Sequence, residues 1–200
     1  MPSSYIDKIQ LIINGIQLPE DTTSLVQSPG LKCLYVGRGD IEQKRVHLVA
    51  EVARWLQESG TGQMTYMGNV KPAIPEALQG YGVFLGEKSD PAEMDRIYRE
   101  HHALVLLSAY EGFPMVVMEA MARGLSIVST GVGDIPFHVK HEENGLLIGE
   151  ADILEHTYEA LQRLATDPAL QQRFRDNNIT YARAHFGMNA FAGAYRALLT

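Results

Sequence analysis

Residues 104–124, Leu-Val-Leu-Leu-Ser-Ala-Tyr-Glu-Gly-Phe-Pro-Met-Val-Val-Met-Glu-Ala-Met-Ala-Arg-Gly, decide the fold class. Residues 104–107 are apolar without alternation, which is typical of a strand covered on both faces in a parallel sheet. A short loop with Glu111 and Gly112 follows, and residues 115–123 are then apolar nearly all round and end before a glycine. Such a segment predicts a buried helix. The stretch therefore predicts a strand, a loop and a helix of an α/β protein.

The remainder of the chain repeats this pattern of strand and helix. Further strands are expected at residues 31–36, 64–67, 83–85, 126–129 and 146–148. Further helices are expected at residues 43–58, 91–102, 152–166 and 187–200, and Asp167 with Pro168 begins another as an N-cap followed by proline. The alternation indicates a doubly wound parallel α/β sheet, folded as one domain over residues 1–200.

The composition limits the classes of function. With 200 residues, 46% hydrophobic and 20% charged, the chain suits one globular domain with a sizeable core. Its formal net charge of -7 argues against binding to nucleic acid or to an anionic membrane surface. No apolar stretch approaches the roughly 20 residues that span a bilayer, so no transmembrane segment is expected. The lone cysteine, Cys33, lies in an apolar run, which predicts a small core residue and suits the reducing cytoplasm.

The beginning of the chain has neither the basic region nor the apolar region of a signal peptide. Residues 9–13 already predict a strand, and a strand so close to the first residue suggests that sequence upstream is absent. Residues 14–30, with several prolines, serines and threonines, are expected to form a loop at the edge of the domain.

A first candidate site follows the strand at residues 104–107, because ligands of doubly wound sheets bind beyond the carboxyl ends of the strands. The helix start near Pro114 presents free amides and the positive end of the helix dipole, which suit an anion. Gly112 allows a ligand to approach the backbone closely. Glu119 lies in an apolar helix, where a carboxylate needs donors such as two vicinal ribose hydroxyls. Glu111, on the loop, would lie near the group joined to the phosphate.

Ordinary structural roles are the alternative for these carboxylates. Glu111 would then cap the helix, and Glu119 would pair with a buried arginine. For an arbitrary pair of glutamates these structural roles would be favoured, and it is the family resemblance described below that reverses this preference.

A second candidate site follows the strand at residues 31–36. Arg38 ends this strand and Lys44 opens the next helix. Two cations at such a turn suit a diphosphate, the arginine by its bidentate fork and the lysine as a point charge. Taken alone the pattern is weak, since surface arginines and lysines are often only solvated charges.

Residues 108–124 resemble the E-x7-E motif of the large retaining glycosyltransferase family often called group 1, which has the GT-B fold. The spacing from Glu111 to Glu119 fits this motif, as do Glu-Gly-Phe and Glu-Ala-Met-Ala-x-Gly. The resemblance extends to shorter segments at residues 14–16, 126–136 and 143–147. It spans nearly the whole chain, but only the C-terminal domain of that family.

This resemblance implies a Rossmann-like GT-B domain that binds a nucleotide-sugar donor. The implied reaction is a retaining, metal-independent transfer of the sugar from a nucleotide diphosphate sugar to an acceptor, as in the biosynthesis of cell-surface polysaccharides. No cofactor is implied, and the chain contains no Asp-x-Asp to hold a divalent ion. The acceptor would be bound by an N-terminal domain or by a partner subunit.

The resemblance also implies a role for each candidate residue. Glu111 is the expected catalytic residue, at the donor sugar, and Glu119 is expected to bind the ribose. The other expected donor-binding residues comprise the two cations and the start of the helix: Arg38, Lys44, Gly112, Phe113, Pro114, Met115 and Val116. Without a metal, the charge of the leaving group would be stabilised by the cations and by the helix N-terminus.

Three departures from the family pattern stand out. Arg45 follows Lys44 where a glycine is usual. Near Gly133 the usual Gly-Gly-x-Pro-Glu is changed, because Asp134 replaces the second glycine and Phe137 replaces the glutamate. Residues 68–81, near the expected nucleobase pocket, are shorter than usual, so the sequence does not predict the base.

Other interpretations are a non-catalytic nucleotide-binding module, a donor-binding subunit that needs a partner chain, and a phosphorylase or sugar-nucleotide epimerase on the same fold. A Rossmann dinucleotide site is not expected, since Glu42 and Pro136 occupy the third glycine position of the two Gly-x-Gly segments. His138 and His141 lack a third ligand at metal spacing, so no zinc site is expected. The stripe Met115, Met118 and Met121 indicates core packing.

Overall fold

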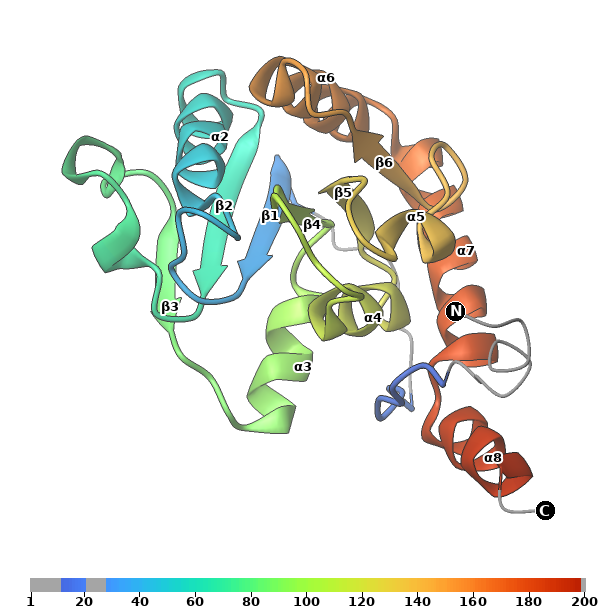
Figure 1. Cartoon of the computed structure of the whole chain (residues 1–200). Coiled ribbons are helices and arrows are strands. Elements are labelled where there is room, and N and C mark those ends of the chain that lie inside the picture. Colours follow the sequence, from blue (N-terminus) through green and yellow to red (C-terminus); the bar gives the residue numbers. More distant parts are fainter. Residues whose placement is uncertain (1–11, 21–27, 199–200) are drawn as a thin grey trace.

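The protein is described by a computed structural model over residues 12–20 and 28–198. Six strands form one sheet in the order β3-β2-β1-β4-β5-β6, and every neighbouring pair is parallel (Figure 1). The strands are β1 (Leu31–Val36), β2 (Gly62–Met67), β3 (Val83–Gly86), β4 (Ala103–Leu106), β5 (Ser126–Thr130) and β6 (Gly145–Ile148). This is the strand order of the doubly wound Rossmann-like sheet, and the predicted fold class is confirmed.

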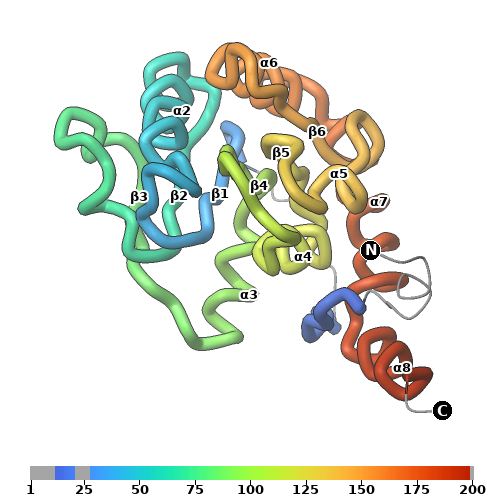
Figure 2. The backbone as a smooth tube through the Cα atoms, viewed as in Figure 1, coloured from blue at the N-terminus to red at the C-terminus, as the bar shows by residue number. Residues whose placement is uncertain are grey.

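Helices cover both faces of the sheet. The α-helices are α2 (Val46–Glu58), α3 (Pro91–Arg99), α4 (Met115–Ala122), α5 (Ile135–His138), α6 (Ile153–Thr166), α7 (Pro168–His185) and α8 (Met188–Leu198). On one face α2 packs against α6, and on the other α4 packs against α7, with α3 beside α4 (Figure 2). The short 3-10 helices η1 (Lys71–Ala73) and η2 (Glu76–Leu78) connect β2 to β3.

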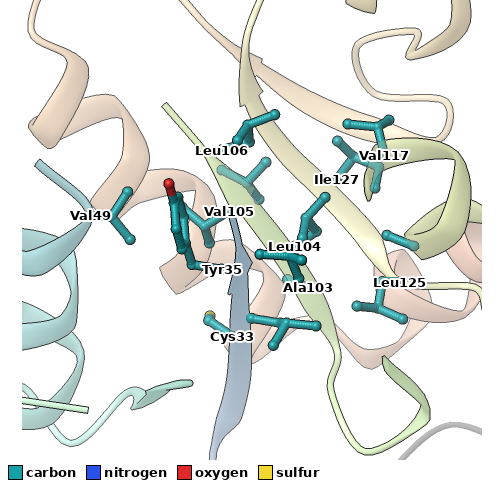
Figure 3. Close-up of a cluster of buried hydrophobic side chains, with 14 of the residues drawn as sticks. Cys33, Tyr35, Val49, Ala103, Leu104, Val105, Leu106, Val117, Leu125 and Ile127 are labelled. Atoms are coloured by element: carbon teal, nitrogen blue, oxygen red, sulfur yellow. The ribbon is translucent and has the colours of Figure 1, made fainter. Parts of the chain in front are cut away.

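The core lies between the central strands and these helices. Every residue of β4 and β5 is buried, because helices cover both of their faces, and this explains why their sequences do not alternate. Figure 3 shows Cys33 and Tyr35 of β1, with Tyr35 toward Val49 of α2, among the buried side chains of this core. Cys33 is fully buried, which raises the pKa of its thiol, and the prediction of a small core residue is confirmed.

Most predicted elements are present with boundaries shifted by a few residues. The N-cap at Asp167 is confirmed, since its side chain accepts a hydrogen bond from the amide of Leu170 at 2.9 Å. The strand predicted at residues 9–13 is not formed by residues 12 and 13, and its other residues lie outside the described ranges. Among the described residues no helix combines the length and apolar character needed to cross a membrane.

The prediction that the methionine stripe of α4 packs in the core is wrong for Met115. Met118 and Met121 are buried, but 47% of Met115 is exposed. Met115 is the first residue of α4 and therefore lies at the end of the helix, beyond the neighbours that cover the later turns. The exposed side chain belongs to the edge of the sheet where the candidate site lies.

Candidate functional site

The predicted site residues lie at the carboxyl ends of β1 and β4, which are neighbours in the sheet. From β1 the chain moves outward through β2 to β3, and from β4 it moves in the opposite direction through β5 to β6. The loops that leave β1 and β4 therefore diverge, and this is the position where open α/β sheets bind ligands. The first loop contains Arg38 and Lys44, and the second contains Glu111 and Gly112.

An ion pair joins the two loops. Lys44 Nζ lies 2.6 Å from Glu111 Oε1, and the side chains are only 14% and 6% exposed. The amide of Ala109 also donates to the carbonyl of Gln43 at 2.8 Å, and Gln43 Nε2 donates to the carbonyl of Tyr110 at 3.3 Å. Two residues that the sequence assigned to one ligand are thus brought together across 67 positions of chain.

Glu111 does not cap α4, so the alternative in which this carboxylate serves as the helix cap is wrong. The N-cap of α4 is Pro114, and no side chain among the described residues caps this helix. The first amides of a helix have no partner within it, which leaves those of Met115 and Val116 available to an anion. The helix start and the Lys44 ammonium both present positive charge to this edge of the sheet.

Gly112 faces open space. A Cβ atom added there would meet no other atom within 4 Å. Behind this loop, Gly133 has a φ of 58°, and a Cβ atom on it would come within 2.1 Å of the carbonyl oxygen of Glu111. Asp134, one of the departures, donates its amide to the carbonyl of Gly112 at 3.0 Å. The loop after β5 therefore supports the Glu111–Gly112 turn from behind and leaves its other side open.

Arg38 is less fixed than Lys44. Its side chain is 70% exposed, donates from Nη2 to Gln43 Oε1 at 2.8 Å and lies 3.7 Å from Asp40. Arg38 lines a cleft of about 570 Å³ at the carboxyl ends of β1 and β2. Gly68 and Asn69 also line this cleft, on the segment where the sequence placed the nucleobase pocket.

Arg45 shows why a glycine is usual at its position. Its φ of 46° and ψ of 42° place it in the left-handed region, which glycine adopts without strain. Its guanidinium pairs with Glu150, which follows β6, at 2.9 Å. The departure therefore keeps the backbone turn and adds a contact between two loops at the carboxyl edge of the sheet.

Glu119 has a partner that sequence reasoning missed. Tyr98 of α3 donates its hydroxyl to Glu119 Oε2 at 2.7 Å, so the structural alternative, a buried arginine paired with this carboxylate, is not what the structure shows. Arg123 contacts the backbone carbonyl of Glu119 instead, at 3.1 Å. A tyrosine on the apolar side of a helix predicts core packing, and no sequence signal ties it to a glutamate 21 residues away.

Phe113 is half-buried, and its ring packs against two aromatic neighbours. The ring stacks on His138 with centroids 4.1 Å apart and contacts Phe186 at 5.5 Å. Within the described part of the chain, no three residues of the types histidine, cysteine, aspartate or glutamate are grouped so that they could hold a metal ion.

Comparisons with known proteins identify the family of this chain. The family model "Glycosyl transferases group 1" matches residues 30–167. An uncharacterized glycosyltransferase, MJ1607, of Methanocaldococcus jannaschii is 26% identical over 161 residues, which cover 71% of this chain and 41% of that protein. The chain thus spans less than half the length of this curated relative.

Solved structures share the fold. Staphylococcus aureus TarM, in a complex that contains UDP, aligns with a TM-score of 0.79 and 14% identity over 98% of this chain and 41% of its own. The pneumococcal O-GlcNAc transferase GtfA, in complex with UDP and GlcNAc, aligns with a TM-score of 0.73 and 18% identity over 94% of this chain and 38% of its own. Because the family model covers more than half of the chain, this protein belongs to the group 1 glycosyl transferases.

Proposed function

We propose that this chain is the donor-binding half of a retaining, metal-independent glycosyltransferase that transfers a sugar from a nucleotide diphosphate sugar to an acceptor. The observation that carries the proposal is the buried pair of Lys44 and Glu111, which joins the loops after β1 and β4. The pair brings one cation and one carboxylate together at the edge where open α/β sheets generally bind ligands, which supports the proposal. These are the two charges needed beside a diphosphate and a donor sugar.

In this proposal the diphosphate lies between Lys44, Arg38 and the start of α4. A lysine ammonium has three donors, so the hydrogen bond from Lys44 to Glu111 leaves two for phosphate oxygens. The exposed Arg38 supplies a second cation from the rim of the cleft. Together with the amides of Met115 and Val116, these groups would stabilise the negative charge that develops on the leaving diphosphate.

The same arrangement orients Glu111 toward the donor sugar. Lys44 holds one carboxylate oxygen, and the open side of Gly112 lets the sugar approach the backbone of the loop. The ribose would lie farther along α4 at Glu119. The UDP named in the complexes of TarM and GtfA makes UDP the first donor nucleotide to test.

The length of the relatives supports a two-part enzyme. The chain spans 41% of the relative from Methanocaldococcus jannaschii. We therefore place the acceptor site, and the other wall of the cleft, in an N-terminal domain or a partner subunit. Separately, we propose that the enzyme lies in the cytoplasm. The alternative is a non-catalytic nucleotide-binding module with the same donor site.

Thermal shifts with UDP, GDP, ADP and CMP at millimolar concentration test the donor site. A nucleotide present at 100 times its dissociation constant stabilises the fold by about 2.7 kcal/mol, or roughly 5 to 10 °C for a chain of this size. We expect one nucleoside diphosphate to give a selective shift that is lost in Lys44→Ala and Glu119→Ala. The control is Lys32→Ala, because Lys32 lies at the opposite end of β1.

Absence of a shift with all four nucleotides would contradict the proposal. A shift that survives in Lys44→Ala and Glu119→Ala would mean that a nucleotide binds elsewhere. Because we expect this chain to be inactive alone, transfer from the matching nucleotide sugar is measured in the presence of the acceptor-binding domain or partner subunit, with and without Glu111→Ala, and this separates an enzyme from a binding module. Catalysis requires the activity to fall while nucleotide binding persists.

A further inference from the structure

Glu119 is held in place before any ligand arrives. The Tyr98 hydroxyl donates to its Oε2 atom at 2.7 Å, from α3 to α4. Oε1 accepts no hydrogen bond from residues 12–20 or 28–198. One oxygen of the carboxylate is thus engaged and the other is available. A charge-assisted hydrogen bond of this kind restricts the conformations open to the Glu119 side chain.

Tyr98 itself is rigid. It is only 1% exposed, and the Arg123 guanidinium lies over its ring, 5.2 Å from the centroid. Arg123 Nε in turn lies 2.8 Å from Asp95 Oδ1, and Arg99 Nε lies 2.6 Å from Asp95 Oδ2. The ring is therefore clamped between the core and a network of charged groups that joins α3 to α4.

The Tyr98 hydroxyl acts only as a donor to the carboxylate. Burial raises the pKa of this tyrosine, and the adjacent charge of Glu119 and the hydrogen bond to it raise the pKa further. The hydroxyl therefore keeps its proton at neutral pH. A neutral donor also suits the purpose, because it leaves the negative charge of Glu119 for a ligand, whereas an arginine partner would neutralise it.

We propose that Tyr98, clamped by Arg123, is a positioning residue that orients Glu119 for the vicinal hydroxyls of the donor ribose. The inference rests on the proposed function, in which Glu119 binds the ribose. Tyr98 touches no substrate, and it acts by fixing one carboxylate oxygen so that the other is aimed before the donor binds. Pre-organisation of this kind increases affinity because the side chain loses no further freedom on binding.

The test compares a nucleotide with its analogue that lacks ribose hydroxyls. Dissociation constants are measured by calorimetry for UDP and for 2′,3′-dideoxy-UDP, or for the matching pair of whichever nucleotide gives the largest thermal shift. The dissociation constant of the analogue divided by that of UDP isolates the recognition of the hydroxyls from that of the base and the diphosphate. A change in packing alone would weaken both ligands alike and leave the ratio unchanged.

We expect Tyr98→Phe to lower this ratio about tenfold, which is the usual effect of a lost hydrogen bond to a charged group, and to leave the affinity for the dideoxy analogue unchanged. Tyr66→Phe is the control, because Tyr66 is also buried and its hydroxyl donates to the carbonyl of Val49, at 3.4 Å, rather than to a carboxylate. Glu119→Gln should remove most of the discrimination, and Tyr98→Phe should then have no further effect.

Two outcomes separate this inference from the function on which it rests. If wild-type protein prefers UDP to the analogue and Tyr98→Phe preserves that preference, the positioning role is wrong and the donor site stands. If wild-type protein binds neither ligand, the donor site itself is wrong. Arg123→Gln supplies a second variant should Tyr98→Phe fail to fold, and it should lower the same ratio because it loosens the ring.

Discussion

Two ion pairs of equal length lie in different surroundings. Lys44 Nζ and Glu111 Oε1 are 2.6 Å apart, and so are Arg163 Nη1 and Glu142 Oε1. The first pair is 14% and 6% exposed and joins the loops after β1 and β4, whereas the second is 52% and 40% exposed and joins α6 to the turn before β6. Distance therefore does not distinguish them, and their exposure to water does.

The difference in exposure supports the proposed role of the Lys44–Glu111 pair at a ligand. A solvent-exposed pair is screened and contributes about 0 to 1 kcal/mol. Two charges removed from water gain little net stability as a pair, but the loss of one partner leaves a charge that is both buried and unpaired. A fold gains little stability from such an arrangement, and its position at the carboxyl edge of the sheet agrees with the proposed use by a ligand.

Removal of the Lys44 charge should have the largest effect on stability. In Lys44→Met the Glu111 carboxylate keeps its burial and loses its cation, so we expect a loss of about 3 kcal/mol, or roughly 6 to 12 °C in melting temperature. Urea unfolding at pH 7 measures the change. The double variant Lys44→Met, Glu111→Leu should recover most of the loss, since neither charge remains.

Arg163→Met is the matched variant for the exposed pair. It should lower the free energy of unfolding by less than about 1 kcal/mol. Equal losses in Lys44→Met and Arg163→Met would show that burial does not separate the two pairs. The inference that the loop pair is maintained for a ligand would then lose its physical basis.

The sequence was sufficient for the fold because local patterns carry it. The unbroken apolar residues of β4 and β5 require cover on both faces, and the alternation with helices leaves a doubly wound sheet as the natural solution. The ends of helices could also be predicted from neighbouring residues, as at Gly124, whose φ of 77° favours a glycine. The short α5 helix carried no such pattern, since its four residues include a proline.

The partners within the site could not be predicted in the same way. The sequence placed Lys44 and Glu111 at one ligand, but their contact with each other depends on the register that joins β1 to β4. The bond from Tyr98 to Glu119 depends on how α3 lies beside α4. Both contacts depend on the packing of segments that are distant in the chain, and such packing produces no periodic pattern in the sequence. Met115 was misjudged for the same reason, since the neighbours of a helix end are not encoded in its stripe.

Arg45 provides an intermediate case between the two ion pairs. Its pair with Glu150 is 22% and 56% exposed, and its backbone is left-handed. Both Arg45→Gly and Arg45→Ala lose the ion pair, but alanine retains the cost of the left-handed conformation, which is about 1 kcal/mol. We therefore expect the glycine variant to be more stable than the alanine variant by about that amount, as measured by urea unfolding.

Arg96 provides the opposite control for this comparison. It lies in the right-handed helix α3 and also pairs with a glutamate, Glu100, on an exposed surface. At this position glycine should be less stable than alanine by about 1 kcal/mol. If the glycine and alanine variants had the same order of stability at positions 45 and 96, the assignment of backbone strain to Arg45 would be contradicted.

The smallest effect should be the pH dependence of the exposed pair. The hydrogen bond from Arg163, followed by its charge, holds the pKa of Glu142 below its ordinary value of 4.5. The contribution of Glu142 is therefore fully present above that ordinary pKa and is lost as the pH falls through the lowered one. The difference in melting temperature between wild-type protein and Glu142→Gln, a few degrees at most at pH 7, should shrink toward zero at acidic pH and also in about 1 M salt. A difference that is unchanged by acid and salt would mean that Glu142 acts through packing rather than charge, and the contrast between the two pairs would have to be drawn on other grounds.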